Sequence, residues 1–192
     1  MVNVGNKRIV LQVWIGSEPS SDILGMMTDT SKMPGYLLIS DQNFIGAKKW
    51  KSAKSYCRNP VVKKYVDAVK AQEYTVQMKN TMISDFIRFH FASENKNVLY
   101  MDCDCVMKKE PIICGAGPFF VGTQTRYIHD MYAFYSKSTE YFFDLISAAI
   151  HKLSYTAPYV QVFINTINGS DEQVRTMNRT CFNHLNRESW VS

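Results

Sequence analysis

The sequence predicts an α/β fold in which a mixed, mostly parallel sheet is flanked by helices within a single domain. Short apolar and β-branched runs alternate with segments of helical periodicity, as in sheets built with crossover helices. The chain has 192 residues, of which 46% are hydrophobic and 20% charged, which suits one substantial core rather than disorder. No repeat or low-complexity linker divides it, so we expect one domain over residues 1–192.

The first expected elements are a strand, a short helix and a second strand. Residues 7–15 are apolar and β-branched, and the Gly-Ser-Glu-Pro sequence that follows ends the strand. Ser21 or Asp22 is expected to cap a helix that ends near residue 28. A short strand over 36–39 then ends at a Ser-Asp pair.

Two longer helices are expected before the central strand. Asn59 and Pro60 suit the N-cap and the first position of a helix that reaches about residue 71. Residues 80–94 form a second helix, which leads directly to an apolar strand over 98–102. The apolar stripe of this second helix is expected to consist of Ile83, Phe86, Ile87 and His90.

The second half of the chain predicts two more strands and two more helices. The strands cover residues 119–123 and 132–135. Ser138 is expected to cap a helix over 139–153, and the proline at position 158 to open another over 158–166. This continued alternation of strands and helices predicts a sheet that is at least partly parallel.

The central strand ends in two carboxylates, Asp102 and Asp104. Because a strand alternates its faces, we expect both to point one way, and Cys103 and Cys105 to point into apolar packing. Two adjacent carboxylates stay ionised only beside a cation, and hard oxygen ligands suit Mg²⁺ or Mn²⁺ carrying a substrate phosphate. Ligands of parallel sheets bind beyond the carboxyl ends of strands. The alternative is a solvated turn after the strand.

An ionic pair is expected close to these carboxylates. Asp85 and Arg88 are three residues apart on the helix over 80–94, so they share one helix face. That helix feeds the central strand through only a few residues, which predicts that the pair lies beside the carboxylates. Arg88 can then meet a phosphate, and Asp85 can accept hydrogen bonds from sugar hydroxyls. The alternative is an ordinary surface ion pair.

Charge, cysteine content and hydropathy exclude several classes of protein. The net charge of +5 is dispersed, so we expect no nucleic-acid binding. A mild lysine cluster over 48–54 is interpreted as a solvated helix face. The alternative is that these lysines attract an anionic substrate or make peripheral contact with a membrane. The five cysteines form no disulfide framework, and a zinc site at Cys103, Cys105 and Cys114 matches no familiar spacing. No transmembrane segment or secretion signal is recognisable, so a cytoplasmic protein is expected.

Two motifs together resemble a known family. Ser-Asp-Phe-Ile-Arg-Phe over 84–89, followed by Val-Leu-Tyr-Met-Asp-Cys-Asp over 98–104, resembles the DXD region of retaining glycosyltransferases of family 32 type. This family is related to yeast α-1,6-mannosyltransferases and to the glucosylating domains of clostridial toxins. Four weaker matches lie elsewhere in the chain. They are an opening strand over 10–16, a Thr-Ala-Pro turn over 156–158, the histidine at 184 and the Ser-Trp pair at 189–190.

The resemblance implies a GT-A fold and a metal-dependent sugar transfer. The donor would be a nucleotide-sugar, a UDP- or GDP-sugar, and the acceptor a glycan, a lipid-linked molecule or a protein. Asp104 would bind Mn²⁺ or Mg²⁺ directly, and Asp102 would contact the metal, the ribose or the sugar. Asp85 and Arg88 would hold sugar hydroxyls.

The resemblance assigns four further residues to the site. Tyr100 would face the nucleotide, and Trp14 would lie by the base, with a core position as the alternative for Trp14. His184 would be the third metal ligand; a structural, hydrogen-bonded histidine is the alternative. Trp190 would cover the donor, with an exposed tail as the alternative.

Two rival functions remain open from the sequence. A phosphatase of the HAD type also places Asp-x-Asp after an apolar strand, and Asp102 would be its nucleophile. That motif normally lies near the N-terminus, and only Asp171 and Glu172 are available as its downstream acidic pair. The second rival is a nucleotide- or sugar-binding module without catalysis. If the reaction inverted the sugar, Asp130 would be the general base to check.

Overall fold

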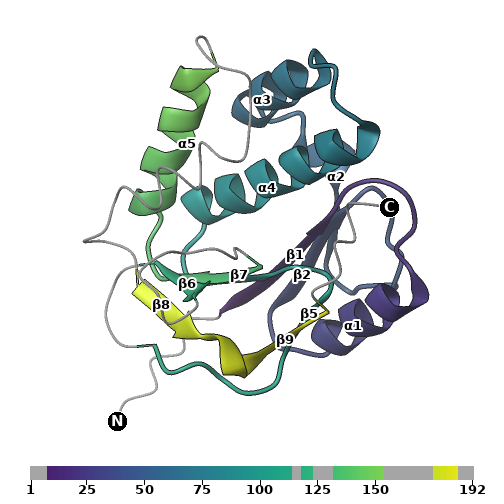
Figure 1. The fold of residues 1–192 in the computed structure, drawn as a ribbon, viewed down its shortest axis with the longest axis vertical. Coiled ribbons are helices and arrows are strands. Elements are labelled where there is room, and N and C mark those ends of the chain that lie inside the picture. Colours follow the sequence, from purple (N-terminus) through teal and green to yellow (C-terminus); the bar gives the residue numbers. More distant parts are fainter. Residues whose placement is uncertain (1–7, 114–117, 123–131, 154–174, 186–192) are drawn as a thin grey trace.

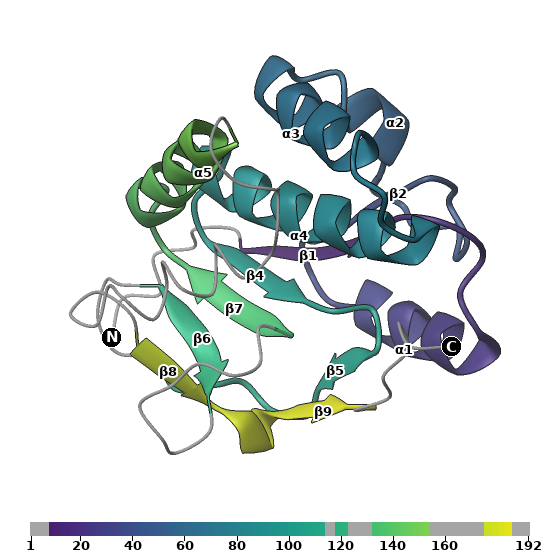
Figure 2. The ribbon, with the colours of Figure 1, turned by 45° about the horizontal axis from the view of Figure 1, so that its top comes forward.

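The computed structural model describes residues 8–113, 118–122, 132–153 and 175–185, and the α/β class expected from the sequence is confirmed in them. Helices lie on both faces of a seven-stranded sheet whose order is β3-β2-β1-β4-β7-β6-β8 (Figures 1 and 2). Its strands are β1 (Ile9–Trp14), β2 (Tyr36–Ser40), β3 (Trp50–Ser52), β4 (Val98–Met101), β6 (Phe119–Gly122), β7 (Ala133–Ser136) and β8 (Arg175–Asn178).

The sheet is mixed and mostly parallel. The pairings of β1 with β2, β1 with β4, β2 with β3 and β6 with β8 are parallel, whereas β7 runs antiparallel to β4 and to β6. Strands β2 and β3 add to one side of β1, and β4 adds to the other side. The strand order therefore reverses between β1 and β4, which is the place where open α/β sheets bind ligands.

The helices divide between the two faces of the sheet. Four lie on one face, and α1 lies on the opposite face together with a small antiparallel sheet of two strands, β5 and β9 (Figure 2). The helices are α1 (Ser21–Ser31), α2 (Ala53–Tyr56), α3 (Pro60–Lys70), α4 (Val76–Glu94) and α5 (Glu140–Lys152). Strand β5 covers Cys105–Met107, and a 3₁₀ turn (Arg179–Cys181) connects β8 to β9 (Phe182–His184).

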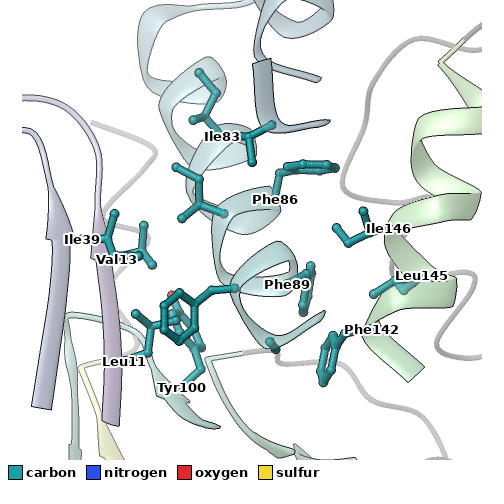
Figure 3. Packing of buried hydrophobic residues seen from close by; sticks show 14 of the residues in the cluster. Leu11, Val13, Ile39, Ile83, Phe86, Phe89, Tyr100, Phe142, Leu145 and Ile146 are labelled. Carbon is teal, nitrogen blue, oxygen red and sulfur yellow. The ribbon is translucent and has the colours of Figure 1, made fainter. Parts of the chain in front are cut away.

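The sheet separates two hydrophobic clusters. In the larger one, α4 lies between the sheet, which contributes Leu11 and Tyr100, and α5 (Figure 3). Phe89 of α4 stacks on Phe142 of α5, and Phe86 of α4 stacks on Tyr65 of α3. The other cluster joins α1, the opposite face of the sheet and the small sheet. Along β1 and β4, alternate residues point into the two clusters, as the period of a strand requires.

The capping residues explain where two of the helices begin. Asn59 accepts hydrogen bonds from the N–H groups of Val61 and Val62 at 2.9 and 3.4 Å, which confirms the expected start of α3 at Pro60. Helix α4 begins four residues earlier than expected, at Val76, because Thr75 accepts a hydrogen bond from the N–H of Met78.

The remaining elements differ from expectation mainly in short pieces. Helix α1 extends to Ser31, and Thr139 rather than Ser138 is the N-cap of α5. The sequence missed β3, α2, β5, β8 and β9, which have three or four residues each and so carry little periodic signal. The helix expected over 158–166 lies outside the described residues. No helix in the described part is long and apolar enough to cross a membrane.

Candidate functional site

The candidate site lies where β4 ends, beside the point at which the strand order reverses. The ladder between β1 and β4 has its last pair at Leu11 and Tyr100. Beyond Met101 the chain turns away from β1, and the N–H of Asp102 donates to the carbonyl of Tyr132 at 2.7 Å. Asp102 and Asp104 therefore project from the turn that follows the strand, at the carboxyl edge of the sheet.

The expectation that a strand aligns the two carboxylates was wrong in its geometry. The N–H of Cys105 donates to the carbonyl of Asp102 at 3.0 Å, which closes a tight turn over residues 102–105. The turn nevertheless brings the carboxylates of Asp102 and Asp104 together. Cys103 and Cys105 are buried in the hydrophobic cluster, as expected, and burial raises the pKa of both thiols.

His184 joins the two carboxylates through the small sheet. Strand β9 pairs with β5 so that His184 lies opposite Cys105, and the N–H of Leu185 donates to the carbonyl of Asp104 at 3.1 Å. The Nε2 atom of His184 lies 3.3 Å from Oδ1 of Asp104. One ligand atom from each of Asp102, Asp104 and His184 lies within 4.8 Å of the others, and no other such group occurs among the described residues.

The ring of Tyr132 supports this histidine. It stacks on the His184 imidazole with centroids 4.5 Å apart and an interplanar angle of 6°. Because the Tyr132 carbonyl also accepts the hydrogen bond from the N–H of Asp102, one residue contacts two members of the candidate metal group.

Arg88 of α4 connects the expected ionic pair to the carboxylate turn. Its Nη2 atom lies 2.7 Å from Asp85, and its Nη1 atom lies 2.9 Å from Oδ1 of Asp102 and 3.2 Å from the Tyr100 hydroxyl. The Tyr100 hydroxyl donates to the same Oδ1 atom. The guanidinium also lies 4.8 Å from the centroid of the Tyr100 ring. The sequence prediction that the pair lies beside the carboxylates is therefore confirmed.

Burial and neighbouring charge shift the ionisation of the site. Burial raises the pKa of Asp102 to about 6; Arg88 and the Tyr100 hydroxyl oppose this rise, while Asp104 and Asp85 add to it. Burial also raises the pKa of Asp85, against the opposing effect of Arg88. With every carboxyl ionised, Asp85 and Asp102 share the single positive charge of Arg88 and Asp104 lies beside Asp102, which leaves an excess of negative charge that a divalent cation would balance.

The donor set suits a divalent cation. Arg88 and the Tyr100 hydroxyl both contact Oδ1 of the Asp102 carboxylate, so Oδ2 is the candidate ligand atom of this residue. Two carboxylates and one imidazole form a mixed oxygen and nitrogen set, which can hold Mn²⁺ or Mg²⁺. Cys103 and Cys105 of the zinc alternative join no metal-binding group among the described residues, and Cys114 lies outside those residues.

Trp14 is half-buried at the end of β1, where its indole N–H donates to the carbonyl of Ser17 at 2.7 Å. It packs against the cluster on the α1 face, and both its expected base contact and the core alternative stay predictions. Several other expected features lie outside the described residues: Cys114, Asp130, Thr156 to Pro158, Asp171, Glu172, Ser189 and Trp190.

Three residues of the site were missed from the sequence: Gln12, Tyr36 and Tyr132. Gln12 of β1 donates a hydrogen bond to the Asp102 carbonyl in the turn, and the Tyr36 hydroxyl of β2 donates to the Gln12 side chain. One signal for Gln12 was present, since it is the one strongly polar residue of the strand Ile-Val-Leu-Gln-Val-Trp. A polar side chain inside a buried strand requires a hydrogen-bond partner, and the place of that partner was not readable locally.

Comparisons with known proteins give a likeness of fold. No protein-family model matches the chain, and no curated protein matches it. The crystal structure of mouse xyloside xylosyltransferase 1 in its apo form matches with a TM-score of 0.55 at 9% identity, covering 90% of this chain and 85% of that chain. The glycosyltransferase GlyE of Streptococcus pneumoniae matches with a TM-score of 0.43 at 11% identity, covering 90% of this chain and 46% of that chain.

The match to the xylosyltransferase agrees with the GT-A-like fold expected from the sequence. The chain thus has a GT-A-like α/β fold, and its cluster of two aspartates and a histidine lies at the carboxyl edge of the sheet.

Proposed function

We propose that this chain is a divalent-metal-dependent glycosyltransferase whose donor is a UDP- or GDP-sugar. The observation that carries the proposal is the convergence of Asp102, Asp104 and His184 at the carboxyl end of β4, in a fold like that of a xylosyltransferase. The acceptor would be a glycan, a lipid-linked molecule or a protein, and the reaction would retain the configuration of the sugar. The whole chain, residues 1–192, would form the catalytic domain.

The proposed metal ligands are Asp102 through Oδ2, Asp104 and His184. Mn²⁺ is the preferred ion because an imidazole joins the carboxylates, and Mg²⁺ is the alternative. When bound, the cation would stabilise the negative charge that develops on the leaving diphosphate. Arg88 and Tyr100 hold the other oxygen of Asp102, which would orient the carboxylate toward the cation.

The donor sugar is proposed to lie near the ion pair of Asp85 and Arg88, whose polar groups would bind its hydroxyls. The nucleotide would extend toward Tyr100 and Trp14, with Trp190 covering it. The assignments of Asp85, Arg88 and Tyr100 rest on the resemblance of the two sequence motifs, and the contacts among these residues and Asp102 support them. The assignments of Trp14 and Trp190 rest on the weaker matches alone.

A thermal-shift panel tests the proposal. UDP, GDP, CDP and their sugars would each be added with and without Mn²⁺. A ligand at a hundred times its dissociation constant adds roughly 2.7 kcal/mol, a visible shift. Stabilisation by one nucleotide family that requires Mn²⁺ is the expected result, and it would name the donor base.

The same panel separates the rivals. Metal-dependent nucleotide binding with no breakdown of any nucleotide-sugar would favour a binding module without catalysis. No shift with any nucleotide, together with phosphate release and trapping of phosphate on Asp102, would favour the phosphatase and contradict the transferase.

A further inference from the structure

The backbone carbonyl of Asp102 receives two hydrogen bonds. One comes from the N–H of Cys105 and closes the turn; the other comes from Nε2 of Gln12, and both measure 3.0 Å. Gln12 lies in β1 and is 0% exposed. The Tyr36 hydroxyl, on β2, donates to Oε1 of Gln12 at 3.0 Å. A chain of contacts therefore runs from β2 through β1 to the turn that carries the candidate metal ligands.

The Gln12 amide acts where the ladder between β1 and β4 stops. After the last pair, Leu11 with Tyr100, the chain leaves β1 to form the turn. The N–H of Asp102 donates to the Tyr132 carbonyl, and the Asp102 carbonyl accepts a hydrogen bond from the Gln12 side chain of β1. The chain can thus turn at this point without leaving a buried polar group unpaired.

The Asp102 carbonyl determines which end of the amide faces the turn, because a carbonyl can only accept a hydrogen bond. The NH₂ group of Gln12 therefore faces the turn, and the Tyr36 hydroxyl, which can donate or accept, donates to the Oε1 atom at the other end of the amide. The opposite orientation would place two oxygen acceptors against each other. Burial, with a smaller contribution from Cys103, raises the pKa of Tyr36 well above its usual range, so the hydroxyl keeps the proton that it donates to Oε1.

We propose that Gln12 and Tyr36 are positioning residues that hold the 102–105 turn in its metal-binding geometry. They touch no ligand themselves and act through the main chain of Asp102. The inference rests on the proposed function for its effect on a metal, whereas the effect on the turn is independent of it. Second-sphere partners of metal ligands commonly change metal affinity by about 10- to 100-fold when they are removed.

The test uses Gln12→Met, which keeps the length of the side chain without the amide, Tyr36→Phe, and the double variant. Binding of Mn²⁺ is measured by the loss of the free-ion EPR signal. We expect Gln12→Met to weaken binding about 10- to 100-fold and Tyr36→Phe to weaken it less. In the Gln12→Met background, Tyr36→Phe should cause no further loss of Mn²⁺ affinity, because Tyr36 acts only through Gln12.

Stability and Mn²⁺ affinity should respond differently when Tyr36→Phe is added to Gln12→Met. Gln12→Met leaves the buried Tyr36 hydroxyl without its acceptor, so the double variant should be more stable than the single one. Its Mn²⁺ affinity should nevertheless stay as low as that of Gln12→Met. Tyr56→Phe is the matched control, because it removes a tyrosine hydroxyl bonded to His90 rather than to this chain of contacts. It should leave Mn²⁺ affinity unchanged.

A metal-free measurement keeps the inference testable if the proposed function fails. Hydrogen exchange of the Cys105 N–H, which closes the turn, should be faster in Gln12→Met by more than the change in global stability explains. Unchanged exchange at Cys105 would overturn the inference. If the unaltered protein binds Mn²⁺, an unchanged Mn²⁺ affinity in Gln12→Met would also overturn the inference. Absence of Mn²⁺ binding in the unaltered protein would instead contradict the proposed metal, and the exchange result would still decide the role of Gln12.

Discussion

Asp102 is held through its N–H, its carbonyl and its carboxylate, although it lies in a turn. Its N–H donates to Tyr132, its carbonyl accepts from Gln12, and its Oδ1 atom is held by Arg88 and Tyr100. A side chain with one oxygen held in this way loses little further freedom when a cation binds the other. At the scale of single residues, the site is therefore organised before any ligand arrives.

Asp104→Asn tests the proposed metal ligand directly. The amide keeps the size of the side chain and removes the charge, so Mn²⁺ affinity should fall by at least about a hundredfold, more than for a second-sphere partner. Isothermal titration calorimetry would measure this loss, and circular dichroism would check the fold. Asp29→Asn is the matched control because Asp29 is exposed and pairs only with Lys32 in the described structure. Equal loss in both variants would contradict a specific role for Asp104.

The raised pKa of Asp102 predicts a pH dependence. With its pKa near 6, the metal-free carboxyl carries a proton below that pH, and a cation must displace it. A raised folded-state pKa also means that this group favours the fold at low pH and loses that contribution as the pH rises through about 6. Stabilisation by Mn²⁺ should therefore be larger at pH 7.5 than at pH 5.5. Carbon-detected NMR of the metal-free Asp102 carboxyl should give a midpoint near 6, and a midpoint below 4 would contradict the prediction.

At the scale of elements, α4 serves both the core and the site. One side of the helix places Phe86 and Phe89 in the larger hydrophobic cluster, and another directs Asp85 and Arg88 toward the carboxylate turn. The side chains of Arg88 and Asp85 are only 6% and 11% exposed. A buried pair of this kind depends on both partners, since either charge alone would be buried without compensation.

Removing one partner of this pair should therefore destabilise the protein. Arg88→Met leaves Asp85 without its counter-charge and should reduce the free energy of unfolding by roughly 3–5 kcal/mol in a denaturant titration. The double variant Asp85→Leu/Arg88→Met should recover much of that loss, because both buried charges are then absent. No difference between the single and the double variant would show that the pair is not coupled.

At the scale of the whole molecule, the site joins two sheets. Asp102 follows a strand of the main sheet, Asp104 leads into β5, and His184 ends β9 of the small sheet. The small sheet is attached through the cluster on the α1 face, in which Phe182 packs edge-on against Tyr132. The metal group thus depends on the docking of one sheet against the other.

Phe182→Ala tests this dependence, although Phe182 is not a proposed ligand. Loss of its buried ring should loosen β9, move His184 and weaken Mn²⁺ binding by about tenfold or more. The thermal midpoint would be measured in parallel, because truncation of a buried Phe commonly costs about 3–5 kcal/mol. Phe143→Ala, on the exposed face of α5, is the control and should change neither quantity appreciably. Normal Mn²⁺ affinity in folded Phe182→Ala would contradict the docking argument.

Features that depend on neighbours along the chain were predictable from the sequence. The alternation of strands and helices, the Asn-Pro start of α3 and the shared face of Asp85 and Arg88 follow from backbone geometry over a few residues. The α/β class and the proximity of the Asp-Arg pair to the carboxylates were therefore predictable.

Features that depend on distant partners became visible only in the folded chain. His184 meets Asp104, 80 residues earlier, because β9 pairs with β5, and strands of three residues carry no readable register. The turn at Asp102 and its support by Gln12 and Tyr36 likewise depend on where one strand stops pairing with another. The physical reason is that hydrogen bonds between distant segments leave no periodic pattern in either segment alone, whereas helices and strands do.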